Sequence, residues 1–571
     1  MKTFRTRIVS SLTFVMFLAS LPLFGQQKIS DELQKKVDFI FQEWDKPTTP
    51  GGIIGVIKDG DLIYTKGYGM ANLEYNIPIF NKTVFRVASI SKQFTAACIL
   101  MLEEQNKLSL DDKLSDYFEG FPAYADQIQV KHLLYHTSGL RDFFKLAMLS
   151  GYNEQDRFTS EEVLEMIKRQ KNLNFEPGTD MLYNNSGYFL LGEIVKKVAG
   201  EGIGVFAQKN IFDPLKMFNT HFHDNHKMIV RNRASGYASG ENGGFEIYMS
   251  NLSIIGDGGL FTTVEDLAKW DWNFYYNRLP ITNFTQKMQE KGRLSNGEKL
   301  SYAAGLDHGE HRSIKTVGHS GAFVGFRSQL LRFPELNMTV ICLSNVSSLP
   351  ATKLAYQVAD VMLDSLNIES QLSLEVLEVE SRNPKLKLEL QELVGNYELA
   401  NGMVVKLFTE KGEFYIDFLG QIKMQLFAKS KSEFFAKEID LSLAFIPSKE
   451  KGGSSFWLSL NGKKIFAEKA ASQYGVDLNE FVGTYYSDEL NAYYSISRVG
   501  DKLFLKVGNK LKTPFSMIKI DKWAMEDGLA SFHRNAEGAI TSFEVKAGPI
   551  RKLHFIKQVE NYSTALGIRR F

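Results

Sequence analysis

Strand-like runs at both ends of the first 365 residues constrain the fold of this chain more than any other feature. The stretch GGIIGVIKDGDLIYTKGYG, residues 51–69, is typical of two strands joined by a tight turn at Asp59–Gly60. Strand patterns return at TVGHSGAFVGFRSQLLRF, residues 316–333, and at MTVICLSN, residues 338–345. Helical and loop-rich segments fill residues 105–300. The distant strands are therefore expected to form one antiparallel sheet with a mostly helical insert, an α+β fold.

From about residue 385 the pattern changes to short alternating runs separated by turns, such as KLFTEKGEFYIDFLG and DKLFLKVGNKL. A weak internal repeat starts at LQELVGNYEL, residues 390–399, and again at LNEFVGTYYSDEL, residues 478–490. Each copy continues as a series of strands punctuated by glycine. We therefore expect two small all-β barrels, at residues 385–470 and 475–560.

The length and charge of the chain limit its organisation and its partners. A chain of 571 residues is too long for one hydrophobic core, so two to four domains are expected. Its 67 Lys and Arg residues against 66 Asp and Glu residues give a net charge of +1. Because no basic excess is available to neutralise phosphates, a nucleic-acid partner is not expected.

The first residues, MKTFRTRIVSSLTFVMFLASLPLFGQQ, place basic side chains before an apolar run that ends near Phe24. This arrangement is typical of a secretory signal peptide, with cleavage expected near Gly25. The alternative is a retained membrane anchor, but serines and Pro22 make the run short and polar for a bilayer span. The mature protein is thus expected to be exported, to the periplasm or outside the cell, with no membrane span left after cleavage.

The two cysteines, Cys98 and Cys342, lie inside apolar runs. Export would permit a disulfide, but the pattern favours two buried thiols that pack as small hydrophobic side chains. Neither lies in a spacing typical of metal ligands.

The stretch FRVASISKQFTAACILMLEE, residues 85–104, contains a serine three positions before a lysine. The Ser-x-x-Lys pattern alone is weak evidence, because it also occurs as SKEK at 448–451 and as SMIK at 516–519. Residues three apart on a strand point to opposite faces, which sets the last copy aside. Only Ser89 and Lys92 begin a helical apolar stripe, where they share one face near the positive helix terminus.

A serine hydroxyl is a weak nucleophile unless a base lies within hydrogen-bond reach. A lysine can be that base only if desolvation or a nearby cation lowers its pKa. Phe85, Val87 and Phe94 would provide a partly dry setting for Lys92. The alternative is that the pair is ordinary surface decoration of a helix.

Two further patterns involve polar residues beside apolar segments. In EPGTDMLYNNSGYFLLGEIVKKV, Tyr183 and Asn185 precede an apolar helix, where a phenol can relay protons and an amide can orient a carbonyl. The alternative is a buried tyrosine with an asparagine helix cap. In TVGHSGAFVGF, His319 and Gly321 lie on an apolar strand, where a glycine permits close approach of a substrate backbone. The alternative there is a histidine of a turn.

The order Ser-x-x-Lys, then Tyr-x-Asn, then His-x-Gly resembles the serine β-lactamase and penicillin-binding protein family. The likeness is closer to its class C and D-alanyl-D-alanine carboxypeptidase branch, the S12 peptidases. LLYHTSGLRDF, residues 133–143, and GDGGLFTTVEDLAKW, residues 256–270, also look like this family. The resemblance covers roughly residues 30–365. It implies an antiparallel sheet flanked by helices plus a helical subdomain, within residues 26–370.

The resemblance also implies roles for individual residues. Ser89 would be acylated by the substrate carbonyl, with Lys92 as its base. Tyr183, as a phenolate or as a hydrogen-bond relay, would pass protons to the leaving group, and Asn185 would bind the substrate amide. Water would then hydrolyse the acyl-enzyme, with no metal or organic cofactor.

His319 would stand where β-lactamases usually carry the lysine of Lys-Thr-Gly, and Gly321 would lie beside the substrate. The backbone N–H groups of Ser89 and Ala322 would form the oxyanion hole. An imidazole attracts a substrate carboxylate less than a lysine does, which argues against a dedicated β-lactamase. Family members with histidine here include carboxypeptidases and D-aminopeptidases, and some of these carry lipocalin-like barrels after the hydrolase domain.

Two other motifs resemble functional sites of different kinds. GHSGA around Ser320 resembles the nucleophile elbow of α/β-hydrolases, but that motif needs a glycine where Ala322 stands. HFHDNH, residues 221–226, gathers three histidines that could in principle bind zinc, but no fourth ligand follows at a defined spacing.

The sequence thus predicts an exported serine hydrolase that acts on small peptides or amides, of the D-alanyl-D-alanine carboxypeptidase or D-aminopeptidase type. A carboxylesterase or weak β-lactamase of the same fold is the first alternative. A penicillin-binding or sensor protein without turnover is the second.

Overall fold

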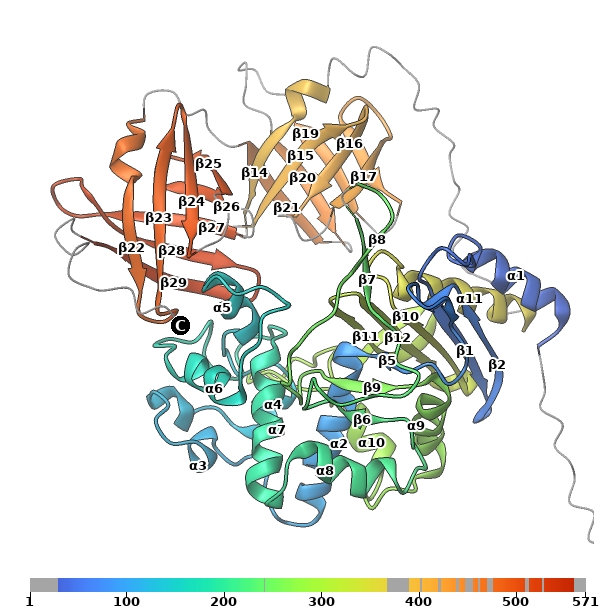
Figure 1. Ribbon diagram of the computed structural model, residues 1–571. Helices are drawn as coiled ribbons and strands as arrows, with labels where there is room; N and C mark the ends of the chain where they lie inside the picture. Colours follow the sequence, from blue (N-terminus) through green and yellow to red (C-terminus); the bar gives the residue numbers. More distant parts are fainter. Residues whose placement is uncertain are drawn as a thin grey trace, which may run out of the picture.

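The computed structural model, shown in Figure 1, describes residues 29–240, 242–366, 390–400, 403–418, 423–437, 441–446, 455–460, 463–469, 476–508, 513–525 and 528–558. The predicted signal peptide and the SKEK tetrapeptide lie outside these residues. None of the helices in the described part of the chain has the length and hydropathy that a membrane-spanning helix needs.

A central sheet joins the two ends of the first 366 residues, as the strand patterns predicted. Its strands run in the order β10 (Asp307–His311), β11 (Ile314–Phe323), β12 (Phe326–Phe333), β13 (Met338–Ser344), β1 (Gly52–Lys58) and β2 (Asp61–Tyr68). The pairs are antiparallel, and β1 pairs with β13 from Gly52 opposite Ser344 to Lys58 opposite Met338. The prediction of a sheet built from distant segments is confirmed.

Both faces of this sheet are covered, and alternate residues of a strand enter different hydrophobic clusters. On β13, Val340 and Cys342 pack toward α1 (Asp31–Phe41) and α11 (Ala351–Ser365), whereas Ile341 and Leu343 pack toward the helical insert. This alternation follows from the two-residue period of a strand. Cys98 and Cys342 are buried and free, as expected.

The insert is mostly helical and surrounds α2 (Ser91–Glu104), in which every residue from Ser91 to Leu102 is buried. A helix buried along most of its length belongs in the interior of a domain, and the apolar residues from Phe94 to Leu102 supply most of that buried surface. The other helices among the described residues from 29 to 366 are η1 (Ala88–Ile90), α3 (Leu114–Tyr117), η2 (Ala123–Asp126), α4 (Val130–Leu134), α5 (Phe143–Leu149), α6 (Ser160–Lys168), α7 (Asn185–Ala199), α8 (Ile203–Ala207), η3 (Gln208–Phe212), α9 (Val264–Tyr276), α10 (Phe284–Gln289) and η4 (Pro334–Leu336).

Short strands connect these helices. They are β3 (Met70–Asn72), β4 (Ile77–Pro78), β5 (Phe85–Arg86), β6 (His221–Phe222), β7 (Tyr237–Ser239), β8 (Phe245–Ile247) and β9 (Leu260–Thr262). Strand β9 pairs with both β5 and β6. It therefore brings the segment after Asp257 beside the segment that leads into α2.

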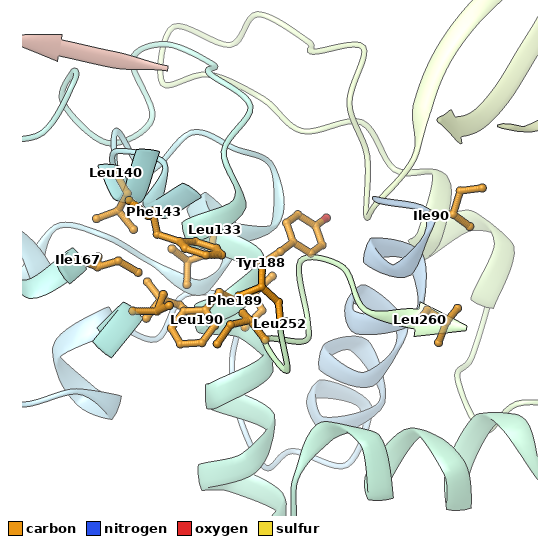
Figure 2. Close-up of a cluster of buried hydrophobic side chains, with 14 of the residues drawn as sticks. Ile90, Leu133, Leu140, Phe143, Ile167, Tyr188, Phe189, Leu190, Leu252 and Leu260 are labelled. Atoms are coloured by element: carbon orange, nitrogen blue, oxygen red, sulfur yellow. The ribbon is translucent and has the colours of Figure 1, made fainter. Parts of the chain in front are cut away.

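The helix α7 is anchored by an apolar cluster, shown in Figure 2. Tyr188, Phe189 and Leu190 of α7 lie among buried side chains that include Leu133, Leu140, Phe143, Ile167 and Leu252. Burial of aromatic and branched side chains of this size is the main source of stability at such a junction. The first turn of α7 is consequently held in a fixed place.

The tail forms two closed barrels, each built by eight described strands. Barrel 1 contains β14 (Gly395–Leu399), β15 (Val404–Glu410), β16 (Glu413–Asp417), β17 (Lys423–Ala428), β18 (Glu433–Ala436), β19 (Leu441–Ile446), β20 (Ser455–Leu460) and β21 (Lys463–Lys469). Barrel 2 follows η5 (Leu478–Phe481) and contains β22 (Gly483–Ser487), β23 (Ala492–Val499), β24 (Lys502–Val507), β25 (Thr513–Lys519), β26 (Lys522–Met525), β27 (Gly528–Arg534), β28 (Ile540–Ala547) and β29 (Ile550–Lys557).

The two barrels are copies of one design, as the sequence repeat indicated. Tyr397 donates to the Leu393 carbonyl at 2.9 Å, and Tyr485 donates to the Phe481 carbonyl at the same distance. The barrel-opening glycines of the two copies, at positions 395 and 483, both have φ of +149°. A backbone in this region favours glycine, which explains why both copies carry one there.

The barrels differ in their contact with the rest of the protein. The hydrophobic core of barrel 2 is continuous with the core of the helical insert, whereas barrel 1 has a core cluster of its own. Figure 1 shows barrel 2 above α5. The boundaries of independently folding units stay a prediction.

Candidate active site

The candidate nucleophile and base lie at the start of α2. Ser89 belongs to η1, and Ala88 before it has φ of +46°, so the chain turns sharply just ahead of the helix. The Lys92 Nζ lies 3.2 Å from the Ser89 Oγ, 2.9 Å from the Asn185 Oδ1 and 2.7 Å from the Asp257 carbonyl oxygen. The predicted shared face of serine and lysine is thus present, and three partners surround the amine.

Burial changes the ionisation of Lys92. It lowers the pKa of the Lys92 ammonium to about 8, and the carboxylates of Asp257 and Asp142 oppose part of that change. A neutral lysine amine has a lone pair that can accept a proton from an adjacent hydroxyl. The arrangement can therefore activate Ser89 at mildly alkaline pH.

Tyr183 lies beside this pair. The Lys92 Nζ is 4.9 Å from the centre of the Tyr183 ring. The Tyr183 hydroxyl is buried and has no hydrogen-bond partner within the described residues. Burial raises the pKa of this phenol, and the nearby Ser89 hydroxyl, which lies outside normal hydrogen-bond geometry, opposes only part of the rise. Tyr183 is therefore a neutral phenol, suited to relay a proton through its hydroxyl rather than to act as a phenolate.

Asn185 was expected to lie before the helix, but it is the first residue of α7. Its backbone N–H donates to the Asp142 carboxylate at 2.5 Å, and its side-chain oxygen accepts from Lys92. Asn184 caps the helix by accepting from the Gly187 N–H at 2.9 Å. The capping role and the site role thus fall on neighbouring asparagines.

His319 is buried, with 4% of its surface exposed. Its Nδ1 lies 2.6 Å from the Ser320 carbonyl oxygen and its Nε2 lies 3.1 Å from the Tyr302 hydroxyl. A carbonyl only accepts, so the proton is on Nδ1 and Tyr302 donates to Nε2. Burial, aided by the Lys92 cation, lowers the pKa of His319 to about 4. The imidazole is therefore uncharged near neutral pH.

Gly321 permits a close approach of β11 to the turn that carries Ser89. A Cβ atom at Gly321 would lie 2.3 Å from the Val87 carbonyl oxygen and 3.1 Å from the Ser89 nitrogen. Ala322, the next residue on β11, lines the same cavity as Ser89. Strand β10 pairs with β11 only as far as Gly318, so the following residues of β11 are not covered by β10.

Two site residues stand inside motifs that the sequence analysis quoted but were not singled out there. His136 packs against the Tyr183 ring at a centroid distance of 4.3 Å and accepts from the Asn184 N–H. Its burial lowers its pKa well below the ordinary value. Asp257 lines the cavity, and burial raises the pKa of its carboxyl to about 6. Their positions depend on tertiary contacts, and the only signal for them in the sequence is the two motifs themselves.

A cavity of about 330 Å³ is bordered by Ser89, Asn185, Asp257 and Ala322. Its lining residues do not include Lys92, Tyr183, His319 or Gly321. Charged side chains of both signs reach it, among them Arg86, Glu154, Asp257 and Arg327, together with Phe144, Leu252, Ile254 and Phe323. A cavity of this size, lined by charged and polar groups as well as apolar side chains, suits a small substrate.

The two motifs that were set aside have structural roles. Ser320 lies within the strand β11 rather than at a strand-to-helix turn. The His221 Nε2 and the His223 Nδ1 lie 3.2 Å apart, and both rings pack on Phe261. Within the residues described above, no group of three or more His, Cys, Asp or Glu side chains is arranged to hold a metal ion.

Comparison with known protein families finds one match that covers more than half of the chain. The family model described as Beta-lactamase matches residues 37–363 of the 571. This range contains the seven residues that the sequence analysis singled out as a site.

Of two similar relatives, one extends the likeness beyond that range and the other matches about half of the chain. Penicillin-binding protein 4* of Bacillus subtilis (strain 168) is 25% identical over 453 residues, which cover 76% of this chain and 97% of that protein. A D-aminopeptidase of Gluconobacter oxydans (strain 621H) is 29% identical over 304 residues, which cover 52% of this chain and 56% of that protein. Only about half of the D-aminopeptidase length is therefore matched.

Among solved structures, the octameric penicillin-binding protein homologue from Pyrococcus abyssi is similar, with a TM-score of 0.54 and 25% identity. The similarity covers 84% of this chain and 98% of that one. It therefore includes much of the tail as well as the first 366 residues.

Proposed function

The chain belongs to the beta-lactamase family of serine hydrolases, and from this premise we propose that it is an exported peptidase or amidase for small D-amino-acid substrates. One observation carries the proposal: the Lys92 amine, with a pKa of about 8, lies 3.2 Å from the Ser89 hydroxyl at the edge of a cavity. Export is supported by the signal-like pattern of the first residues.

The proposed reaction begins with acylation. The neutral Lys92 amine accepts the proton of Ser89, and the Ser89 Oγ forms a bond to the substrate carbonyl carbon. The oxyanion accepts hydrogen bonds from the backbone N–H groups of Ser89 and Ala322. As the carbon–nitrogen bond breaks, the leaving amine takes a proton from Lys92, relayed by the Tyr183 hydroxyl.

Deacylation reverses the roles. Water gives a proton to the neutral amine of Lys92 and attacks the acyl carbon, and the Ser89 Oγ leaves with a proton returned from Lys92. Asn185 orients the substrate amide in both steps. Gly321 and the uncovered part of β11 let the substrate backbone lie beside the strand.

The substrate class is inferred from the relatives and from the charges around the cavity. D-aminopeptidases and a penicillin-binding protein are among the relatives. Asp257 and Glu154 can pair with a free substrate amine, and Arg86 and Arg327 can pair with a free carboxylate. An aminopeptidase activity would use the acidic side chains to bind a free amino terminus. A carboxypeptidase activity would use the arginines to bind a free carboxyl terminus.

A panel of matched dipeptides tests this proposal. We expect D-alanyl-D-alanine derivatives to be cleaved at least about tenfold faster, as kcat/KM, than their L-counterparts, because stereochemistry changes the alignment with Ser89. Blocking the amine should abolish an aminopeptidase activity, and amidating the carboxylate should abolish a carboxypeptidase activity. Turnover of nitrophenyl esters without any peptide turnover would instead favour the esterase alternative.

The pH dependence of acylation provides a second test. The rate should rise with pH through a midpoint near 8, because only the neutral Lys92 amine can accept the serine proton. At pH 7 about one tenth of the lysine is neutral. Fluorophosphonate labelling of Ser89 measured between pH 5 and 10 gives the profile, and a rate that does not change across this range would contradict the role of Lys92.

Asp257 offers a control for that profile. Its carboxylate raises the pKa of Lys92, so Asp257→Asn should move the midpoint to lower pH. An unchanged midpoint would show that the rise of the labelling rate with pH follows the titration of a group other than Lys92.

A further inference from the structure

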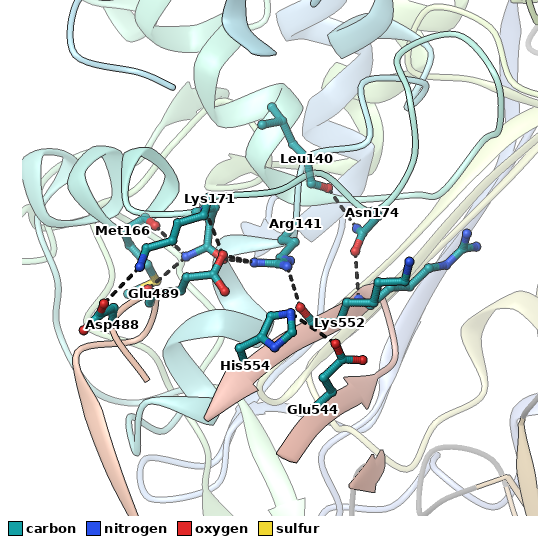
Figure 3. A network of polar contacts seen from close by, with 12 residues as sticks. Leu140, Arg141, Met166, Lys171, Asn174, Asp488, Glu489, Glu544, Lys552 and His554 are labelled. Carbon is teal, nitrogen blue, oxygen red and sulfur yellow. Dashed lines mark hydrogen bonds and ion pairs between the residues drawn. The ribbon is translucent and has the colours of Figure 1, made fainter. Parts of the chain in front are cut away.

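Barrel 2 contacts the segment Ser138–Asp142, which joins α4 to α5 directly behind the site. Figure 3 shows the polar network at this junction. At its centre the Arg141 Nη1 and the Glu489 Oε1 lie 2.5 Å apart, and their side chains are 0% and 4% exposed. The two residues are 348 positions apart in the sequence.

Both members of this ion pair make further hydrogen bonds, although the buried Arg141 Nε has no partner among the described residues. Arg141 also donates to the Gln170 side chain at 2.8 Å and to the Lys552 carbonyl at 2.9 Å. Glu489 also accepts from the Lys171 backbone N–H at 2.8 Å. A buried ion pair with this many hydrogen bonds fixes geometry, because any displacement leaves a buried charge without a partner.

Asn174 provides a second tether beside the first. Its backbone N–H donates to the Gly139 carbonyl at 2.7 Å. Its side-chain amide donates to the Pro549 carbonyl at 3.0 Å and accepts from the Arg551 backbone N–H at 2.8 Å. Gly139 has φ of +72°, and a Cβ atom there would lie 2.1 Å from the Phe175 carbonyl oxygen. The turn between β28 and β29 is thus tied to the same short segment.

The other side of this segment holds the candidate active site. The Asp142 carboxylate accepts from the Asn185 N–H at 2.5 Å, and the Arg141 carbonyl accepts from the Ser186 hydroxyl at 2.6 Å. Asn185 in turn accepts from Lys92. Glu489 of the barrel is therefore connected to Lys92 of the site through Arg141, Asp142 and Asn185. Each of these residues bonds the next by a hydrogen bond or by the peptide chain.

We propose that barrel 2 is a positioning element of the active site and that Glu489 is the positioning residue through which it acts. Glu489 fixes Arg141, Arg141 fixes the backbone of Asp142, and Asp142 holds Asn185 against Lys92. The inference rests on the proposed function in one respect, namely that Lys92 and Asn185 serve the reaction at Ser89.

The neighbouring residue Asp488 supplies a matched control. Asp488 pairs with Lys171 across the same junction at 2.9 Å, but these two side chains are 61% and 63% exposed. An exposed pair of this kind constrains little. Glu489→Gln and Asp488→Asn remove the same charge from adjacent positions, so their comparison isolates the buried pair.

The test measures the rate constant for fluorophosphonate labelling of Ser89 in the full chain, far below the melting temperature of each variant. We expect Glu489→Gln to lower this rate at least about tenfold, because a small misplacement of catalytic groups has effects of that size. Asp488→Asn should stay within about twofold of wild type. A role in stability alone would lower the melting temperature and leave the labelling rate of the folded protein unchanged.

A double variant keeps the test decisive if Glu489→Gln does not fold. Arg141→Met with Glu489→Leu leaves no buried charge unpaired, so the protein should melt near wild type and still label at least about tenfold slower. Labelling at the wild-type rate, or loss of the fold in both variants, would overturn the positioning role. Absence of labelling in wild type would instead refute the proposed function, so the two failures are distinct.

Discussion

Replacing Ser89 by alanine is expected to abolish turnover, with a loss on the order of 10⁴-fold or more, because the acyl-enzyme cannot form without the hydroxyl. Ser89 accepts a hydrogen bond from Lys92, and Lys92 keeps its contacts to Asn185 and Asp257 when the hydroxyl is removed. The free energy of unfolding should therefore change by less than about 1 kcal/mol. Steady-state turnover and thermal unfolding of the same preparation check both statements.

Ser320→Ala is the matched control for this substitution. Ser320 lies on β11 in the motif that resembles a nucleophile elbow, and its side chain is exposed. We expect its loss to change turnover less than about threefold, because the substitution removes an exposed hydroxyl and keeps the Ser320 carbonyl that accepts from His319. Activity that survived in Ser89→Ala and disappeared in Ser320→Ala would move the nucleophile to the other serine.

Replacing Lys92 by methionine is the second change with a large expected effect. Methionine keeps the length of the side chain but removes the base, and acylation should slow by about 10³- to 10⁴-fold, toward the upper end of what general bases contribute. The single-turnover rate of labelling at pH 9 measures this loss directly. Near-normal acylation would remove Lys92 from the mechanism.

Lys92→Arg separates the base from the cation. A guanidinium keeps the positive charge but does not lose its proton in this pH range, so acylation should stay nearly as slow as in Lys92→Met. Recovery of most of the rate in Lys92→Arg would mean that the charge of Lys92, and not its basicity, serves the reaction.

Much of the architecture could be predicted because it follows from local patterns. The continuous apolar runs in MTVICLSN and in GGIIGVIK mark strands that are buried on both faces, and β13 and β1 do pair. The second LNEFVG-type motif, 88 positions after the first, marks the second barrel in the same way. In both cases the information lies within about ten residues.

Part of the site could be predicted for the same reason. Ser89 in η1 and Lys92 at the start of α2 are three positions apart, so their contact is nearly local. Tyr183 and Asn185 could be placed beside them only through the resemblance to a family, since 91 positions separate Tyr183 from Lys92.

The rest depends on contacts that a linear pattern does not encode. His136 belongs to the site because its ring packs on Tyr183. Asp257 belongs to it because its backbone carbonyl accepts a hydrogen bond from Lys92. The charge state of His319 follows from the hydroxyl of Tyr302 and from burial. Likewise Glu489 is one of many acidic residues in a β-rich tail, and only the docking of barrel 2 pairs it with Arg141.

Mass spectrometry of the whole protein after brief exposure to a D-alanyl-D-alanine peptide or a penicillin tests the central claim most directly. Our account predicts one covalent acyl group on the peptide that contains Ser89, formed faster at pH 9 than at pH 7 and absent in Ser89→Ala. A folded wild-type protein that hydrolyses such a substrate and carries its acyl group on another residue would contradict it.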